Sequence, residues 1–272
     1  MHLTDIGANL THSSFHDDLD AVVTRARAAN VGTVIITGTT VLESRLAAEI
    51  ADRLDLYCTA GVHPHHARDF GEQTVTELRK LSLHPRCVAI GECGLDFNRN
   101  YSPHPAQEKC FISQLELALH LGKPLFLHSR DAHPRFAQIL RTHGVKKAVA
   151  HCFTGEAQEL HAYVELDLYI GITGWICDER RGTHLLRLVR DIPADRLLLE
   201  TDSPYLTPRD MKPQPKARRN EPAFLPHILK TVARALGRPP EEVAVQTTRN
   251  AARLFGIDES RASTTAQRTA AA

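Results

Sequence analysis

The feature that most constrains the fold is an alternation of short apolar segments with stretches of helical spacing, repeated along most of the 272-residue chain. Eight segments are rich in β-branched or aliphatic residues and are bounded by Gly, Pro or polar residues, which is typical of buried strands. These predicted strands are Leu3–Gly7, Thr33–Gly38, Leu56–Val62, Cys87–Glu92, Pro124–His128, Ala148–Cys152, Leu168–Ile172 and Arg196–Thr201. Between them apolar residues recur at helical spacing, as at Leu19, Val22, Val23 and Ala26.

The spacing of these segments favours a closed barrel. Equivalent strand ends recur about every 28 residues from Asp5 to Asp202, which is the length of one strand–helix unit. Strict alternation predicts a parallel sheet, and eight units predict an α/β protein with the TIM (β/α)8 barrel fold. An open doubly wound sheet would carry a Gly-rich phosphate loop, and the chain has neither GxGxxG nor GxxxxGK. We therefore expect one catalytic domain over residues 1–257, with C-terminal helices at about Glu221–Leu236 and Pro240–Phe255, and a disordered tail over residues 258–272.

Composition excludes several classes of protein. Hydrophobic residues make up 42% of the chain, charged residues 24%, and the net charge is +1, so the chain is neither a disordered protein nor a polycation. No segment approaches the roughly 20 apolar residues that span a bilayer, and the N-terminus lacks the pattern of a signal peptide. The six cysteines form no CxxC pair. We interpret them as reduced thiols of a cytoplasmic protein with no membrane partner, and we expect a monomer.

Acid and imidazole side chains follow five of the predicted strands, at the ends where catalytic residues of such barrels lie. They are His63, His65, Glu92, His128, His151 and Asp202. Strand alternation puts Glu92 on the face of Ile90 and His128 on the face of Phe126. If the apolar residues fill the barrel, the polar residues converge above them.

This convergence predicts a metal site. Burying several acid and imidazole groups together is costly without a counter-charge, and a divalent cation removes that cost. Imidazoles with carboxylates suit Zn²⁺ or Mn²⁺, while Mg²⁺ accepts the oxygen ligands. The predicted ligands are Glu92, His128, His151 and Asp202.

Two basic clusters follow the seventh and eighth predicted strands. Arg180 and Arg181 stand in the first, and residues 209–219 carry five Lys or Arg residues against one Asp in the second. A charge run alone is typical of a solvated loop, but loops after barrel strands share the catalytic face, which favours phosphate binding. The predicted phosphate-binding residues are Arg130, Arg180, Arg181, Arg218 and Arg219. Rings that follow strand ends, such as Trp175, either stack on nucleobases or pack in the core.

At these residues the sequence resembles the TatD family of metal-dependent deoxyribonucleases, and within it the subgroup of 3′–5′ exonucleases. The likeness covers nearly all of residues 1–257, with specific motifs in a fixed order. The matching stretches are Gly61–His65 (GVHPH), Gly91–Asn100 (GECGLDFNRN), His128–Asp131 (HSRD), His151–Gly155 (HCFTG), Tyr169–Gly182 (YIGITGWICDERRG), Glu200–Leu206 (ETDSPYL) and Arg218–Pro222 (RRNEP).

The resemblance implies a TIM barrel of the metal-dependent hydrolase superfamily that hydrolyses phosphodiester bonds. It implies a 3′–5′ exonuclease of single-stranded DNA, with RNA as a further substrate, that works in the cytoplasm and most often with Mg²⁺. The positions that match the family's metal ligands are Glu92, His128, His151 and Asp202. Many members open with an HxH pair on the first strand, where this chain has Gly7 and Asn9, which puts the usual two-metal arrangement in doubt.

Our mechanistic hypothesis is metal-assisted hydrolysis. Asp202 would take the proton from the attacking water, while His63 and His65 would hold the scissile phosphate or protonate the leaving oxygen. Mg²⁺ is the expected cofactor, with Mn²⁺ or Zn²⁺ as alternatives. One rival function is a metal-dependent deacylase or esterase acting on a carbonyl ester or amide such as aminoacyl-tRNA. Another is a nucleic-acid-binding scaffold with a vestigial site, against which the intact acid and imidazole set argues.

Overall fold

The computed structural model describes residues 2–215 and 218–258 of the chain. In this part, eight strands form one sheet whose order is the order along the chain. They are β1 (Leu3–Ala8), β2 (Val31–Ile36), β3 (Tyr57–Ala60), β4 (Cys87–Asp96), β5 (Leu125–Arg130), β6 (Ala148–Ala150), β7 (Tyr169–Ile172) and β8 (Leu197–Leu199). Each overlaps one predicted segment, and the pairs from β3 to β7 are parallel.

The first strand meets the end of the last one. Ala8 and Ser203 form a parallel bridge, the amide of Asp202 donates to the carbonyl of Gly7 at 2.8 Å, and the amide of Asn9 donates to the carbonyl of Ser203 at 2.7 Å. Together with the strand order, this pairing gives the TIM (β/α)8 barrel that the sequence predicts.

The chain forms two compact units. The central unit comprises residues 36–170, and the terminal unit comprises the described residues among 1–35 and 171–272. The helices of the central unit are α2 (Val41–Leu54), the 3-10 helix η2 (Pro64–Asp69), α3 (Glu72–Ser82), α4 (His104–Leu121), α5 (His133–Thr142) and α6 (Ala157–Glu165). Those of the terminal unit are η1 (Ser13–Phe15), α1 (Leu19–Ala28), η3 (Gly174–Cys177), α7 (Leu185–Leu188), η4 (Val189–Asp191), η5 (Pro222–Phe224), α8 (Leu225–Leu236) and α9 (Pro240–Phe255).

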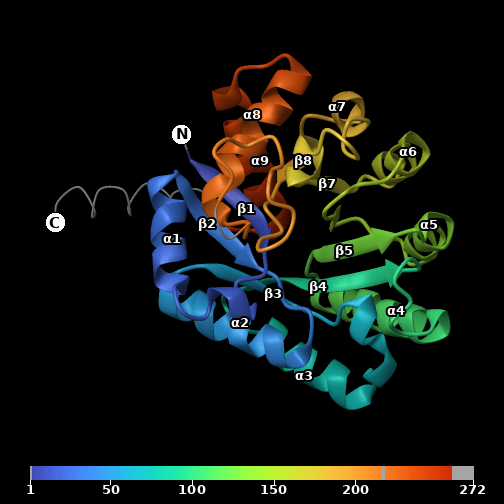
Figure 1. Cartoon of the computed structure of the whole chain (residues 1–272). Helices are drawn as coiled ribbons and strands as arrows, with labels where there is room; N and C mark the ends of the chain where they lie inside the picture. The colour runs from blue at the N-terminus through green and yellow to red at the C-terminus, as the bar shows by residue number, and fades with distance from the viewer. Residues whose placement is uncertain (1, 216–217, 259–272) are drawn as a thin grey trace. The chain divides into compact units, whose positions relative to one another are not determined.

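In the central unit, helices cover the outer side of the strands (Figure 1). Helix α2 packs on β3, while α3 and α4 pack on β4. Helix α2 begins at Thr40, whose hydroxyl accepts a hydrogen bond from the amide of Glu43. Ile90 and Phe126 are fully buried, so apolar side chains precede Glu92 on β4 and His128 on β5 along the strands.

In the terminal unit, α9 packs on β1 and β8, and α8 packs on α9 and η3 (Figure 1). Both helices end at a glycine with a left-handed backbone, Gly237 for α8 and Gly256 for α9. The predicted helix Pro240–Phe255 has the observed bounds, and the predicted segment Glu221–Leu236 divides into η5 and α8.

Strand β4 is the longest strand and is buried along all ten residues. Gly91 and Gly94 have φ values of 139° and 148°, and a Cβ at either position would collide with the backbone oxygen of Phe126 or His128 on β5. These two glycines therefore allow β4 and β5 to approach each other at the point where the site residues begin.

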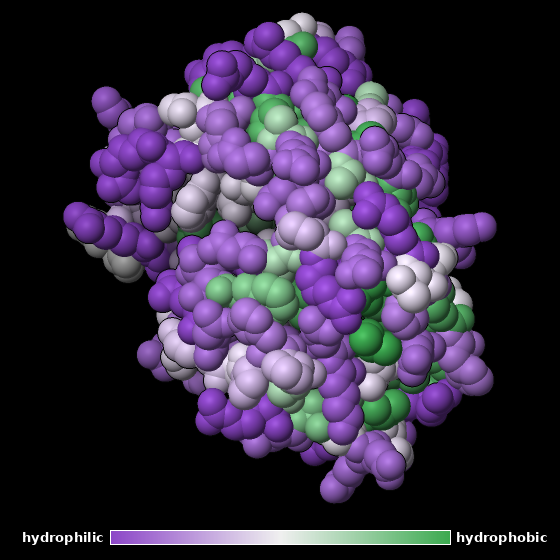
Figure 2. Space-filling model, turned by 90° about the vertical axis from the view of Figure 1, so that its right-hand side faces the viewer, coloured by the Kyte–Doolittle hydropathy of each residue, from purple (hydrophilic) through white to green (hydrophobic). Residues whose placement is uncertain are grey.

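Hydrophilic residues predominate on the face shown in Figure 2, and the hydrophobic ones form small scattered clusters. No helix among the described residues is both long and apolar enough to cross a bilayer. The predicted domain boundary at residue 257 stays a prediction. The predicted tail, apart from Asp258, lies outside the described residues, as does Lys216 of the second basic cluster.

Candidate active site

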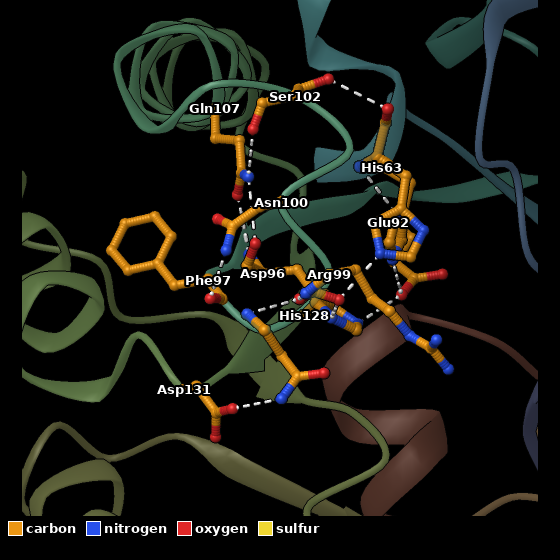
Figure 3. Close-up of polar contacts among 12 residues, drawn as sticks. His63, Glu92, Asp96, Phe97, Arg99, Asn100, Ser102, Gln107, His128 and Asp131 are labelled. Carbon is orange, nitrogen blue, oxygen red and sulfur yellow. Dashed lines mark hydrogen bonds and ion pairs between the residues drawn. The ribbon is translucent and has the colours of Figure 1, made fainter.

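Three histidines of the central unit converge on one carboxylate oxygen. Glu92 Oε1 lies 2.8 Å from His151 Nε2, 2.9 Å from His128 Nδ1 and 3.3 Å from His63 Nε2. Glu92 belongs to β4, His128 to β5, His151 follows β6, and His63 precedes η2. Figure 3 shows His63 and His128 on either side of Glu92. The structure thus brings four of the predicted site residues into direct contact.

Asp96 is a site residue that the sequence reasoning missed. The predicted strand ends at Glu92, but β4 passes an irregularity between Ile90 and Cys93 and continues to Asp96, where it still pairs with β5. Asp96 Oδ2 lies 2.8 Å from His65 Nε2 and 3.5 Å from His128 Nε2. The second contact is an ion pair rather than a hydrogen bond. The available signal was Gly94, since a glycine within an apolar run suggests an irregular strand rather than its end.

The cluster shifts the pKa values of its members. Burial would raise the pKa of Glu92, but His151, His63 and His128 hold it well below its usual value. Burial would also raise the pKa of Asp96, but its contacts with His128 and His65 outweigh burial and lower the pKa. Both carboxylates are therefore ionised at neutral pH.

The pKa values of His63 and His128 are shifted in opposite directions. Burial lowers the pKa of His63 to about 4, against the opposing effect of Glu92. Burial would also lower the pKa of His128, but Asp96 and Glu92 outweigh it and raise the value. His63 Nδ1 accepts a hydrogen bond from the amide of His65 at 3.0 Å, so the neutral ring carries its proton on Nε2.

Two buried glutamines of α4 hold the backbone beside the cluster. Gln114 accepts from the amide of Val62 at 2.8 Å and donates to its carbonyl at 3.0 Å, directly before His63. Gln107 accepts from the amide of Asp96 at 2.8 Å and donates to its carbonyl at 3.0 Å, a contact visible in Figure 3. Each glutamine forms the two main-chain hydrogen bonds that a neighbouring strand would form. Gln114 thereby holds the backbone just before His63, and Gln107 holds the backbone of Asp96.

The donor set of the cluster fits a divalent cation. One ligand atom from each of His63, Glu92 and His128 lies within 4.8 Å of the others. The buried Nε2 of His128 has no hydrogen-bond partner among the described residues. Imidazole nitrogens and carboxylate oxygens in this proportion are ligands for Zn²⁺, Mn²⁺ and, through the oxygens, Mg²⁺.

Asp202, the remaining predicted ligand, belongs to the terminal unit and follows β8. Its backbone is left-handed, with φ at 51°, and its Oδ1 accepts a hydrogen bond from Asn9 Nδ2 at 2.9 Å. A non-glycine residue in this conformation is held there by its surroundings, which is common at functional sites. Asn9 thus positions Asp202 through a side-chain hydrogen bond.

Beneath Asp202, a buried carboxylate joins β1 to the end of β8. Asp5 Oδ1 accepts from the amide of Thr201 at 2.9 Å, and Asp5 Oδ2 accepts from the Thr201 hydroxyl at 2.6 Å. Asp5 is fully buried, and burial raises its pKa to about 8 against the opposing effect of these hydrogen bonds. The carboxyl is therefore largely protonated at neutral pH.

The terminal unit also contains a basic pocket of about 610 Å³, here called the arginine pocket. Its lining includes four arginines, one aspartate and two aromatic rings. These residues are Arg180, Arg181, Arg209, Arg218, Asp178, Trp175 and Tyr205. Arg181 lies over the Trp175 ring at 4.3 Å, and Asp178 pairs with Arg180 and Arg181. Since the arginines outnumber the acid, the pocket carries a net positive charge.

The other predicted phosphate-binding arginines differ in their surroundings. Arg130 is exposed at the end of β5. Arg219 donates to both carboxylate oxygens of Asp18 at 2.8 Å and to Glu221 at 2.9 Å, and it lies over the Phe15 ring. Its guanidinium is thus engaged in a structural network, and its role in phosphate binding stays a prediction.

Comparisons with known proteins agree on one family. Residues 4–256 match the family model described as TatD related DNase. Relatives named 3′-5′ ssDNA/RNA exonuclease TatD are 54% identical in Erwinia tasmaniensis and 51% identical in Klebsiella pneumoniae, each over 93% of this chain and 99% or 98% of the relative. The solved structure of YJJV, a TatD homologue from Escherichia coli K12, matches with a TM-score of 0.86 and 26% identity over 94% of this chain and 98% of that one. The likeness therefore extends over the whole barrel.

Proposed function

Because the chain belongs to the TatD-related DNase family, we propose that it is a divalent-metal-dependent hydrolase that removes nucleotides from the 3′ ends of single-stranded DNA and RNA. The observation that carries the proposal is the convergence of His63, His128 and His151 on one oxygen of Glu92. The relatives' names support the substrate and the polarity, and they do not favour a deacylase of aminoacyl-tRNA. The proposal includes action as a monomer in the cytoplasm, the compartment that six free cysteines favour.

The ion that we propose is Mg²⁺, with Mn²⁺ or Zn²⁺ as alternatives. When bound, it would supply a Lewis acid that polarises the phosphoryl oxygen and lowers the pKa of a water ligand. The proposed ligands are Glu92, His128, His151 and Asp202. His63 is close enough to join them, but its proton on Nε2 is better suited to donate a hydrogen bond to a phosphate oxygen.

The proposed proton transfers use two side chains. Asp202 acts as general base toward the attacking water. His65 acts as general acid toward the leaving oxygen, because its ring is only partly buried and Asp96, hydrogen-bonded to it at 2.8 Å, orients it.

The arginine pocket supports the choice of a nucleic acid as substrate. Arg180, Arg181 and Arg218 are exposed side chains that line it, and guanidinium groups bind phosphates through paired hydrogen bonds. Tyr205 is 51% exposed and its ring meets His12 edge-on, and we propose that its exposed part stacks on a base. We propose that this pocket binds phosphates of the substrate strand, and that Arg130 adds a further phosphate contact.

The test is a digestion of 5′-labelled single-stranded and double-stranded oligonucleotides of DNA and RNA, with Mg²⁺, Mn²⁺, Zn²⁺ or a chelator. A 3′–5′ exonuclease gives a ladder of progressively shorter labelled products on the single strands. Immediate release of a labelled mononucleotide would show digestion from the 5′ end and contradict the proposed polarity. Strands that stay intact with every metal would refute the nuclease assignment.

The site assignment has its own test. Glu92→Gln should lower turnover at least about a hundredfold, because several kcal/mol of transition-state stabilisation depend on the ion. His120→Gln, an exposed histidine of α4, is the matched control and should retain the parent's activity. Parent-like turnover of Glu92→Gln at saturating metal would contradict the assignment of the ligands.

A further inference from the structure

A second group of metal-binding side chains lies in the terminal unit. Cys177 ends η3, Asp210 stands in the segment that follows β8, and His227 lies in the first turn of α8. One ligand atom from each residue lies within 4.8 Å of the other two, and Asp210 Oδ1 is 2.7 Å from His227 Nε2. None of the three belongs to the proposed catalytic set.

The three side chains differ in burial, and the thiol is the most buried of them. Cys177 is 3% exposed, whereas the side chains of His227 and Asp210 are 29% and 36% exposed. Burial raises the pKa of the Cys177 thiol to about 12, with Asp210 adding to the effect and Thr231 opposing it. An ion can therefore enter from the solvent side, and it meets a sulfur at the inner end of the group.

We propose that Cys177, Asp210 and His227 form a second metal site, which takes a thiophilic divalent cation of the Zn²⁺ type with water as the fourth ligand. Sulfur, nitrogen and oxygen donors in one tetrahedral set are the ligands of Zn²⁺ in proteins. Mg²⁺ does not compete, because it is a hard cation that prefers oxygen. Binding releases the thiol proton to solvent and changes no oxidation state.

Such a site would brace one wall of the arginine pocket. Cys177 precedes Asp178, and Asp210 follows Arg209, and both neighbours line that pocket. The ion would join η3 and the segment after β8 to α8, which is fixed on α9. The site itself rests only on residues of the terminal unit and does not depend on the proposed nuclease activity.

Co²⁺ is the probe, because it adopts the geometry of Zn²⁺ and its thiolate complexes absorb in the near ultraviolet. The catalytic ligands that we propose are carboxylates and imidazoles, so a thiolate band reports the second site alone. Titration of the metal-free chain should develop this band until one thiolate-bound ion is present per chain. The band should survive in Glu92→Gln.

Variants locate the site. Cys177→Ser should abolish the band, Asp210→Asn and His227→Gln should each weaken Co²⁺ binding at least about tenfold, and Cys152→Ser should leave it unchanged. The substitutions at Asp210 and His227 alter partly exposed side chains, so these variants test the site even if Cys177→Ser fails to fold. A thiolate band that is absent at saturating Co²⁺, or that persists in Cys177→Ser, overturns the proposal.

A second readout is stability. Zn²⁺ should raise the melting temperature of Glu92→Gln, and that rise should disappear when Asp210→Asn is added. An unchanged rise in the double variant would place the stabilising ion elsewhere and overturn the proposal.

Discussion

Replacing Asp5 by asparagine removes a buried carboxyl while its shape and hydrogen bonds are kept. Asp5 is fully buried between β1 and the end of β8, where it accepts hydrogen bonds from the amide and hydroxyl of Thr201. In the variant, the amide oxygen can accept from the Thr201 backbone and the amide nitrogen can donate to the Thr201 hydroxyl. The two proteins then differ mainly in whether position 5 titrates.

The expected effect follows from the two pKa values of Asp5. Burial raises the pKa in the folded state from its ordinary 3.8 to about 8. Between these values the folded carboxyl keeps its proton and the unfolded one loses it, so the free energy of unfolding of the parent falls as pH rises. The fall is about 3 kcal/mol from pH 5 to pH 7. Asp5→Asn lacks this loss, so its stability relative to the parent should rise by that amount.

The assay is urea unfolding of metal-free parent and variant at several pH values between 5 and 7. Fluorescence of Trp175, the only tryptophan of the chain, and far-ultraviolet circular dichroism should give coincident transitions. Taking the difference between the two proteins cancels the titration of all other groups. Asp17→Asn removes an exposed carboxyl from the same unit and is the matched control.

A constant difference between Asp5→Asn and the parent across this range would refute the reasoning. It would mean that the folded Asp5 is ionised and that the hydrogen bonds from Thr201 compensate for burial. A stability difference, variant minus parent, that falls as pH rises would have the opposite sign to the prediction and would likewise show that the folded Asp5 is ionised.

Four further predictions concern other parts of the molecule. Arg219→Ala should lower the free energy of unfolding in urea by about 1–2 kcal/mol, because Asp18 and Glu221 each lose one of two arginine partners and keep Arg25. Arg218→Ala should change the free energy of unfolding by less than about 0.5 kcal/mol but should flatten the salt dependence of oligonucleotide binding. If Arg218→Ala destabilises the fold and Arg219→Ala flattens the salt dependence, Arg219 is the phosphate-binding residue and Arg218 the structural one. Gln114→Ala should cost about 1–3 kcal/mol, measured in the same way, because the amide of Val62 loses its acceptor and the carbonyl keeps only the weak Cys110 thiol donor. An unchanged stability would show that water replaces the amide. Chelation should abolish nucleotide release and Mg²⁺ or Mn²⁺ should restore it, so turnover that survives chelation would contradict a metal-dependent mechanism.

The strand positions could be predicted because buried strands require apolar runs and the turns between them require Gly, Pro or polar residues. Parity along each strand also placed Glu92 and His128 on the inner face, and the two lie in contact. The bounds of α9 followed from local signals, since Pro240 suits the first helical position and Gly256 the left-handed end. These features depend on residues that are neighbours in sequence.

Features that depend on distant residues were not predictable. Strand β4 continues past an irregularity to Asp96, and only its pairing with β5 shows that this residue reaches His65. Arg219 reads as a free cation, but its partner Asp18 stands 201 residues away. The burial of His63, which is 8% exposed, also depends on distant residues, because His63 leads into η2 and η2 packs on α4.

The two glycines of β4 bear on how this protein could be redesigned. Gly91 and Gly94 are restricted by the backbone of β5, whereas Glu92 and Asp96 between and beyond them are restricted mainly by the side chains that they meet. A library that varies positions 92 and 96 would therefore sample new ligand types on an unchanged main chain, and so could alter the choice of metal. Diversity at 91 and 94 would be lost to misfolding.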